Sequence, residues 1–144
     1  MQDRAVVMVV EDDVEMNRLE CELLEVSGLK AIGAYTGVEA LRLINQCHAD
    51  AVLLDVMLPE MDGFETCRRL RSMTGGDGAG RLPIVIVTAL DTEDCRQLGY
   101  EADADAYFTK PFDPEGVVET ILRLINERNG PDADGRGHTG DGRL

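Results

Sequence analysis

Ala51-Val52-Leu53-Leu54-Asp55 is a short run of apolar residues that ends directly in a carboxylate. Three further runs, over residues 5–10, 83–87 and 104–109, have the same form and lead into Glu11, Thr88 and Lys110. Uninterrupted runs rich in Val, Ile and Leu are typical of parallel strands that are buried on both faces. The pattern therefore predicts a parallel sheet whose strands carry polar side chains at their carboxyl ends.

Segments with a helical period separate these runs. Five strands alternating with five helices predict an α/β fold, a doubly wound five-stranded parallel sheet with helices on both faces. The flavodoxin-like strand order 2-1-3-4-5 would bring the ends of the first and third strands together. We expect strands at residues 5–11, 29–35, 50–55, 83–88 and 105–109, and helices at 14–27, 37–47, 62–73, 92–101 and 113–128.

The spacing of apolar residues also predicts which face of each helix is buried. Gly28 is placed to end the first helix, and Asp113 followed by Pro114 is typical of a helix start. In the first helix the expected buried residues are Met16, Leu19, Leu23, Leu24 and Val26. In the last helix they are Val117, Val118, Ile121, Leu122, Leu124 and Ile125.

Length and composition limit the possible functions. The chain of 144 residues corresponds to one domain, which we place at residues 1–128, followed by a flexible polar tail or linker at 129–144. A second glycine-rich segment, residues 74–80, is predicted to be a surface loop.

The net charge of −14 argues against direct nucleic acid binding. No apolar run is long enough for a membrane span, and no secretion signal is visible, so we expect a cytoplasmic protein with reduced cysteines.

Carboxylates dominate the expected carboxyl edge of the sheet. Asp55 is the candidate nucleophile, because a carboxylate at a strand end can attack a phosphoryl donor and form an acyl phosphate. Glu11 and Asp12 are expected within a few ångströms, and like charges at about 4 Å repel by roughly 4 kcal/mol at an effective dielectric near 20. Such a cluster favours a cation, and Mg²⁺ suits these ligands. The backbone carbonyl of Met57 could add another oxygen.

Two further side chains complete the predicted site. The ammonium of Lys110 could pair with one oxygen of a phosphoryl group on Asp55, and the hydroxyl of Thr88 could donate to another. Either residue alone would be an ordinary strand end. All five predicted site residues are expected at the carboxyl ends of strands, and together they indicate a site for phosphoryl chemistry.

With these residues the chain resembles the receiver domains of response regulators in two-component phosphorelays. The matching motifs are Val9-Val10-Glu11-Asp12-Asp13, Leu54-Asp55-Val56-Met57-Leu58-Pro59-Glu60-Met61-Asp62-Gly63, Val87-Thr88-Ala89 and Tyr107-Phe108-Thr109-Lys110-Pro111-Phe112. They span roughly residues 5–128, in the order and at the intervals of that family.

The resemblance implies that Asp55 accepts phosphate from a histidine kinase or a histidine phosphotransfer protein, with Mg²⁺ as cofactor. Asp12 would bind the metal directly and Glu11 through water, and the bond from Lys110 to Pro111 would be cis. Thr88 would be the switch hydroxyl and Tyr107 the switch aromatic residue. Phosphorylation would then remodel the surface of the fourth helix, fifth strand and fifth helix for an unknown downstream effector.

The chain departs from the family pattern at several positions. Asp103 stands where the family usually has glycine, and we expect a left-handed conformation there. Gly116 and Thr120 replace an acidic and a basic residue that form the active dimer of winged-helix members. These replacements argue against the usual transcription-factor dimer, and the sequence leaves a monomer and a phosphorylation-dependent dimer open. Met57 and Leu90 flank the approach of an attacking water and cannot orient it, so we predict slow autodephosphorylation.

Two other functions compete with that of a phosphorylated signalling module. The first is an enzyme, an aspartate-nucleophile phosphatase of the haloacid dehalogenase type. That class needs a second aspartate two residues after the nucleophile, where this chain has Met57. We therefore expect no enzymatic activity beyond self-phosphorylation and slow dephosphorylation. The second is a receiver-like docking module that works without phosphorylation.

Overall fold

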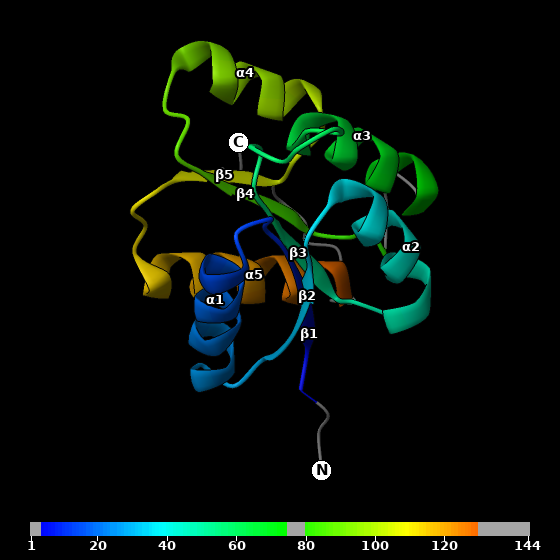
Figure 1. Cartoon of the computed structure of the whole chain (residues 1–144). Helices are drawn as coiled ribbons and strands as arrows, with labels where there is room; N and C mark the ends of the chain where they lie inside the picture. The colour runs from blue at the N-terminus through cyan, green and yellow to red at the C-terminus, as the bar shows by residue number, and fades with distance from the viewer. Residues whose placement is uncertain (1–3, 75–79, 130–144) are drawn as a thin grey trace.

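Five strands and five helices alternate along the described part of the chain (Figure 1). The computed structural model describes residues 4–74 and 80–129. The elements are β1 (Val6–Val10), α1 (Val14–Val26), β2 (Lys30–Ala34), α2 (Gly37–Cys47), β3 (Ala51–Leu54), α3 (Gly63–Thr74), β4 (Ile84–Thr88), α4 (Glu93–Glu101), β5 (Ala106–Thr109) and α5 (Pro114–Asn129).

The strands form one parallel sheet in the order β2-β1-β3-β4-β5, which confirms the predicted topology. In the register between β1 and β3, Val10 lies opposite Leu54. The backbone N–H of Asp55 donates to the carbonyl of Val10 at 3.0 Å, which extends the pairing by one residue. Glu11 and Asp55 therefore leave the sheet side by side at its carboxyl edge.

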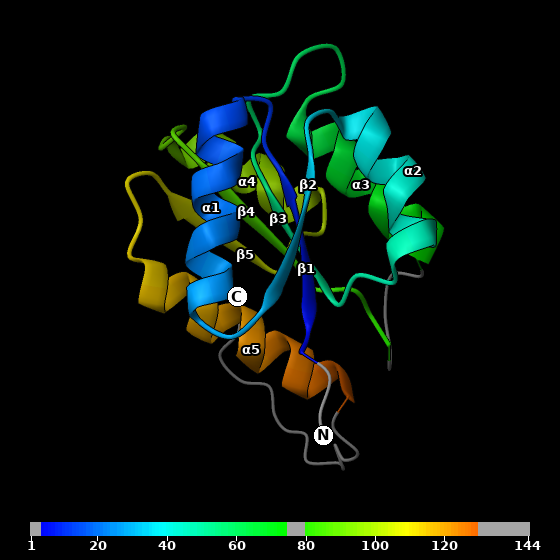
Figure 2. The same ribbon diagram turned by 60° about the horizontal axis from the view of Figure 1, so that its bottom comes forward.

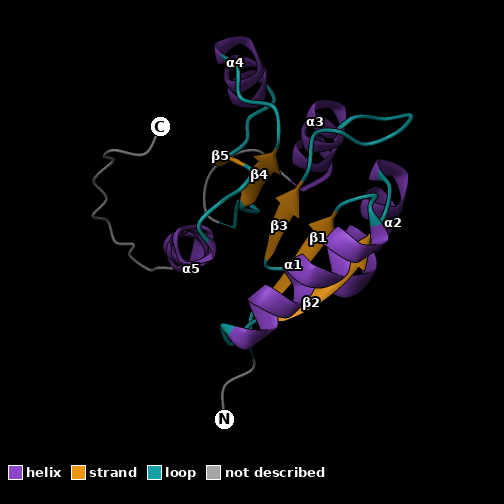
Figure 3. Cartoon of the chain, turned by 60° about the vertical axis from the view of Figure 1, so that its left-hand side comes forward, coloured by secondary structure: helices purple, strands orange, loops and turns teal. Residues whose placement is uncertain are grey.

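Helices cover both faces of the sheet. Figure 1 and Figure 2 show α2 and α3 on one side and α1 and α5 on the other, and Figure 3 shows α4 on the side of α2 and α3. Alternate residues of the central strands enter two separate cores, as expected for side chains of period two. Met8 and Leu54 belong to the core under α2 and α3. Val9 and Leu53 belong to the core under α1 and α5.

The buried face of α1 differs from the prediction. Leu19 is 50 % exposed and Val26 is 87 % exposed, whereas Asn17, Glu20 and Leu24 are buried. Residues 17, 20 and 24 share one helix face because they are three and four positions apart. The apolar periodicity was misleading because two polar side chains on this face have partners in the interior. The prediction that Leu122 of α5 is buried was also wrong, since this side chain is 44 % exposed.

Local backbone features follow the prediction closely. Gly28 has φ = 96° just after α1, and the peptide bond from Lys110 to Pro111 is cis. Asp103 has φ = 72°, the left-handed conformation expected where glycine was replaced. Its carbonyl accepts a hydrogen bond from Arg71 Nη2 at 2.9 Å, and its carboxylate pairs with Arg81 at 3.1 Å. These contacts offset the unfavourable backbone conformation.

The predicted ends of the domain are only partly covered by the structure. Helix α5 extends to Asn129, one residue beyond the predicted boundary. The rest of the predicted tail, residues 130–144, and residues 75–79 of the predicted glycine-rich loop lie outside the described residues. Within the described residues, no helix has the length and apolar character that crossing a membrane would require.

Candidate functional site

Three charged side chains meet at the carboxyl edge of the sheet. Lys110 Nζ lies 3.0 Å from Oδ2 of Asp55 and 2.7 Å from Oε1 of Glu11. Asp55 and Glu11 are almost fully buried, and the Lys110 side chain is 19 % exposed. The three residues follow β3, β1 and β5, so the parallel topology brings together positions up to 99 residues apart in the chain. The predicted convergence of these three residues is confirmed.

Backbone hydrogen bonds fix where each of these residues emerges. Glu11 N–H donates to the carbonyl of Ala34, and Lys110 N–H donates to the carbonyl of Thr88 at 2.8 Å. The side-chain amide of Asn17 donates to the carbonyl of Glu11 at 3.0 Å and to that of Ala34 at 3.1 Å. Asn17 was missed as a site-supporting residue. It holds the end of β1 from α1, and these hydrogen bonds explain why a polar residue is tolerated at a buried position.

The pKa values of the two buried carboxylates are shifted in opposite directions. Burial, together with the hydrogen bond it shares with Asp55, raises the pKa of Glu11 to about 7. Burial also acts to raise the pKa of Asp55, but hydrogen bonding with Glu11, Met57 and Lys110 lowers it below its ordinary value. The ammonium of Lys110 has a raised pKa because its hydrogen bonds to Glu11 and Asp55 outweigh its burial. Asp55 is thus kept ionised, the state that a nucleophile requires.

The remaining predicted metal-binding residues lie around this pair. Asp12 directly follows Glu11 and is exposed. The backbone N–H of Met57 donates to Oδ1 of Asp55 at 3.0 Å, while the Met57 side chain is exposed. Across residues 4–74 and 80–129, no three Asp, Glu, His or Cys side chains are already gathered as a metal cluster. In their place, the Lys110 ammonium bridges two of the carboxylates.

The donor set nevertheless fits a hard divalent cation. Two carboxylates at adjacent strand ends, an exposed third carboxylate and a nearby backbone carbonyl are all oxygen ligands, the type that Mg²⁺ prefers. Asp55 and Glu11 share a single ammonium, so they carry negative charge that a cation could neutralise.

Thr88 and Tyr107 each form a hydrogen bond with Leu90, in the connection between β4 and α4. Thr88 is fully buried at the end of β4, and its hydroxyl accepts a hydrogen bond from Leu90 N–H at 3.4 Å. The phenol of Tyr107, on β5, donates to the carbonyl of Leu90 at 3.0 Å. The predicted switch hydroxyl and switch aromatic residue are therefore linked through a single loop residue.

The ring of Tyr107 lies against α4. The guanidinium of Arg96 sits 5.1 Å from the ring centroid, within the range of a cation–π contact. A Cβ atom built on Gly99 would lie 2.8 Å from the ring, so the absence of a side chain there makes room for it. Arg96 and Gly99 were not predicted to matter. The sequence feature that could have indicated them is their spacing of three residues, which places both on one face of α4.

Glu20 is another residue that the sequence analysis missed. It lies on α1, its side chain is 5 % exposed, and its Oε2 is 3.6 Å from Lys110 Nζ. Burial raises the pKa of Glu20 to about 6, an increase that Lys110 partly opposes. Glutamate is rarely buried without a partner, and only the three-dimensional arrangement shows that Lys110 is that partner.

Comparison with known proteins gives the same picture. The family model described as "Response regulator receiver domain" matches residues 7–122. The chain is 42 % identical over 130 residues to the response regulator MprA of Mycobacterium sp. strain KMS, covering 88 % of this chain and 54 % of that protein. It is 39 % identical over 127 residues to MprA of Mycobacterium leprae, again covering 88 % of this chain and 54 % of that protein. The chain thus spans about half the length of the curated relatives it matches.

Solved structures agree in fold. A putative response regulator from Chloroflexus aurantiacus has a TM-score of 0.75 at 30 % identity, covering 85 % of this chain and 98 % of that one. The chemotaxis protein CheY4 of Vibrio cholerae has a TM-score of 0.76 at 27 % identity, covering 85 % and 99 %. A DNA-binding response regulator from Staphylococcus aureus, at 24 % identity, covering 85 % and 99 %, and a TM-score of 0.75, shares the fold. The chain belongs to the response regulator receiver domain family.

Proposed function

We propose that this domain accepts a phosphoryl group on Asp55 from a histidine kinase or a histidine phosphotransfer protein. The observation that carries the proposal is the Lys110 ammonium, held between the carboxylates of Asp55 and Glu11. In the transfer, an Asp55 oxygen forms a bond to phosphorus while the bond from phosphorus to the donor nitrogen breaks. Lys110 is placed to pair with the negative charge that arrives on the phosphoryl oxygens.

The proposed Mg²⁺ ligands are Asp12, Asp55 and the carbonyl of Met57, with Glu11 acting through water. When bound, Mg²⁺ would neutralise charge on the phosphoryl oxygens. Glu11 keeps Lys110 close to Asp55, and the protein contributes this alignment of charges before the donor arrives.

The proposed response involves Thr88 and Tyr107. A phosphoryl group on Asp55 offers acceptor oxygens to the Thr88 hydroxyl, which now accepts from Leu90 N–H. Turning that hydroxyl toward the phosphoryl group would alter the Leu90 loop, and with it the hydrogen bond from Tyr107. The output surface of α4, β5 and α5 would then change shape for a downstream effector. This is a shift between populations of two conformations.

Several narrower expectations complete the proposal. The domain acts on no substrate besides its own aspartate and the phosphoryl donor, and it works in the cytoplasm as a monomer or a phosphorylation-dependent dimer. Direct contact with nucleic acid is not expected of residues 4–129, since the chain carries a net charge of −14. The longer relatives leave nucleic-acid binding open for a protein that contains further domains.

Intact-mass measurement after incubation with acetyl phosphate tests the proposal. With Mg²⁺ the protein should gain about 80 Da, one phosphoryl group. Neither the sample without Mg²⁺ nor the Asp55→Asn variant should gain this mass. If the parent protein gains no mass under any condition, phosphoryl acceptance is wrong and the docking module that works without phosphorylation takes its place.

A further inference from the structure

The carboxylate of Glu20 is a buried charged group that the proposed phosphoryl transfer does not use. In the described part of the chain, its Oε2 is the buried side-chain oxygen that lacks a hydrogen-bond partner. This atom lies 3.6 Å from Lys110 Nζ, just beyond hydrogen-bond length. A small rotation of either side chain would convert this ion pair into a direct hydrogen bond.

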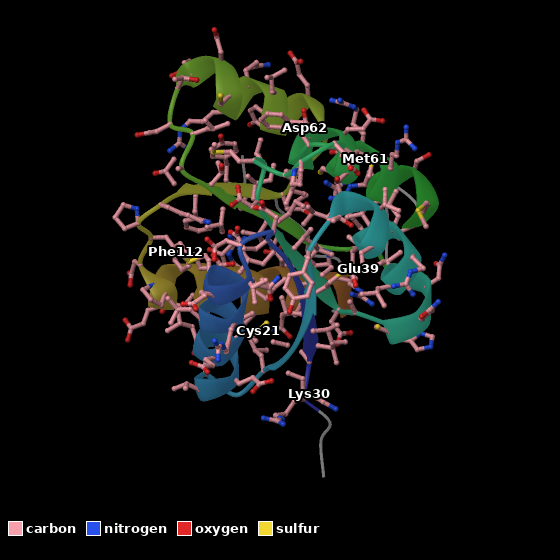
Figure 4. The ribbon with its side chains drawn as sticks, viewed as in Figure 1. Cys21, Lys30, Glu39, Met61, Asp62 and Phe112 are labelled. Atoms are coloured by element: carbon pink, nitrogen blue, oxygen red, sulfur yellow. The ribbon has the colours of Figure 1, made fainter. Side chains whose placement is uncertain are left out.

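The surroundings of Glu20 supply little else for a charge. It borders a small hollow between α1 and α5 that is walled by Leu23, Leu53, Phe112 and Val117. Figure 4 shows Phe112 on the connection from β5 to α5. Among the ion pairs of the described residues, Lys110 is the cation that reaches Glu20. A carboxylate among apolar side chains is unfavourable unless it is paired, so its position depends on Lys110.

Lys110 in turn occupies the oxygens that a metal ion would need. Its ammonium takes Oε1 of Glu11 and Oδ2 of Asp55, and Asp55 is a proposed metal ligand. An ammonium and a divalent cation beside the same carboxylates repel each other and share the same negative charge. We therefore expect bound Mg²⁺ to loosen the contacts of the Lys110 ammonium.

We propose that Glu20 is a positioning residue that receives the Lys110 ammonium when Mg²⁺ binds. This inference rests on the proposed function of the site. Oε2 of Glu20 accepts no hydrogen bond and already lies 3.6 Å from the ammonium, so a small shift would complete a direct hydrogen bond. Glu20 thereby keeps Lys110 charged and close to Asp55, ready for the incoming phosphoryl group.

The lysine content of the chain allows a direct test of the movement. Lys30 and Lys110 are the only lysines in the sequence. Lys30 starts β2, at the end of the sheet away from Phe112 (Figure 4). Protein labelled with ¹³C and ¹⁵N in lysine therefore gives one site signal and one internal reference. Addition of Mg²⁺ should shift the Nζ signal of Lys110 and leave that of Lys30 in place.

Calorimetric titration with Mg²⁺ tests the contribution of Glu20. The measurement is made at pH 8, where the parent carboxylate is ionised. Glu20→Gln removes the charge. Glu20→Asp keeps the charge, but its side chain is one methylene shorter, so the carboxylate lies farther from Lys110. Both should weaken Mg²⁺ binding by about fivefold, the effect of roughly 1 kcal/mol. Glu22→Gln, on the exposed side of α1, removes one charge as a control and should change the affinity by less than about twofold.

The outcomes separate this inference from the proposed function. Unchanged affinity in Glu20→Gln would overturn the inference, and so would parent-like affinity in Glu20→Asp, because Glu20 would then act only as a distant charge. An unmoved Lys110 signal in Mg²⁺-saturated parent protein would overturn it as well. If the parent protein binds no Mg²⁺ at all, the metal site in the proposed function is itself wrong. Urea unfolding of each variant confirms that it is folded.

Discussion

The phenol of Tyr107 donates a hydrogen bond to the backbone carbonyl of Leu90, 3.0 Å away on the connection between β4 and α4. Because Leu90 N–H is bound by the Thr88 hydroxyl, one loop residue joins the aromatic ring on β5 to the buried end of β4. The ring of Tyr107 is only half-buried, so this hydrogen bond helps to define where the ring rests.

Replacing Tyr107 by phenylalanine should remove this hydrogen bond and keep the ring. We expect the free energy of unfolding to fall by about 1 kcal/mol, the net contribution of a typical hydrogen bond. Urea denaturation measures it. Tyr35→Phe is a matched control, because Tyr35 is exposed and its loss of a hydroxyl should change stability by less than about 0.5 kcal/mol. Equal effects in both variants would show that the Leu90 contact contributes nothing.

A methyl group on Gly99 should displace the Tyr107 ring. The added Cβ would lie 2.8 Å from the ring, closer than real Cβ contacts, and the resulting strain typically amounts to 1–3 kcal/mol. The better helix propensity of alanine offsets up to about 1 kcal/mol of this. We expect Gly99→Ala to lower the free energy of unfolding overall, measured by urea denaturation.

Gly116→Ala provides the control for this change. Gly116 lies in α5, and an added Cβ there meets its nearest atom at 3.6 Å, an ordinary contact. This variant should be neutral or stabilised by up to about 1 kcal/mol. If Gly99→Ala is stabilised to the same extent, the ring of Tyr107 moves aside without loss.

The buried carboxylate of Glu20 should make stability depend on pH in a specific direction. Burial raises the pKa of Glu20 from 4.5 to about 6, so the folded protein holds this proton more tightly than the unfolded chain. The contribution is complete below pH 4.5 and is lost as the pH rises through about 6. Its size is about 2 kcal/mol.

Glu20→Gln should therefore become more stable relative to the parent as the pH rises. Urea denaturation at pH 5 and at pH 8 measures the difference between the two proteins, which should grow by about 1–2 kcal/mol in favour of the variant. Glu22→Gln controls for the loss of one negative charge on the same helix. A difference that stays constant between the two pH values would mean that Glu20 titrates normally in the folded protein.

Met57 should limit the rate at which phosphorylated Asp55 is hydrolysed. Its backbone N–H binds the Asp55 carboxylate, and its exposed thioether side chain offers no group that can orient an attacking water. We expect Met57→Asn to lose the phosphoryl group about threefold to tenfold faster, followed by intact mass over time. Met73→Asn, at an exposed position near the end of α3, should match the parent. A parent lifetime of seconds would contradict the prediction of slow autodephosphorylation.

The sequence alone predicted the α/β class and placed Glu11, Asp55 and Lys110 at strand ends. It did not prove the strand order, which was expected because it would bring the ends of the first and third strands together. Continuous apolar runs identified the strands because both faces of a parallel sheet are buried, and a residue such as Asp55 after such a run must lie at the carboxyl edge. Two positions with positive φ were also readable locally, whereas His48 and Glu60, which have positive φ as well, were not predicted. Gly28 ends α1, and Asp103 adopts the left-handed conformation in which glycine was expected.

Only the tertiary structure decided which polar residues of the helices enter the interior. Apolar periodicity assigned Leu19 to the core of α1, but Glu20 is buried there because Lys110, 90 positions later in the chain, supplies its counter-charge. The contact of Tyr107 with Gly99 likewise depends on how α4 packs beside β5. Such pairings join distant segments, and a local sequence pattern carries no information about a partner that folding alone brings within reach.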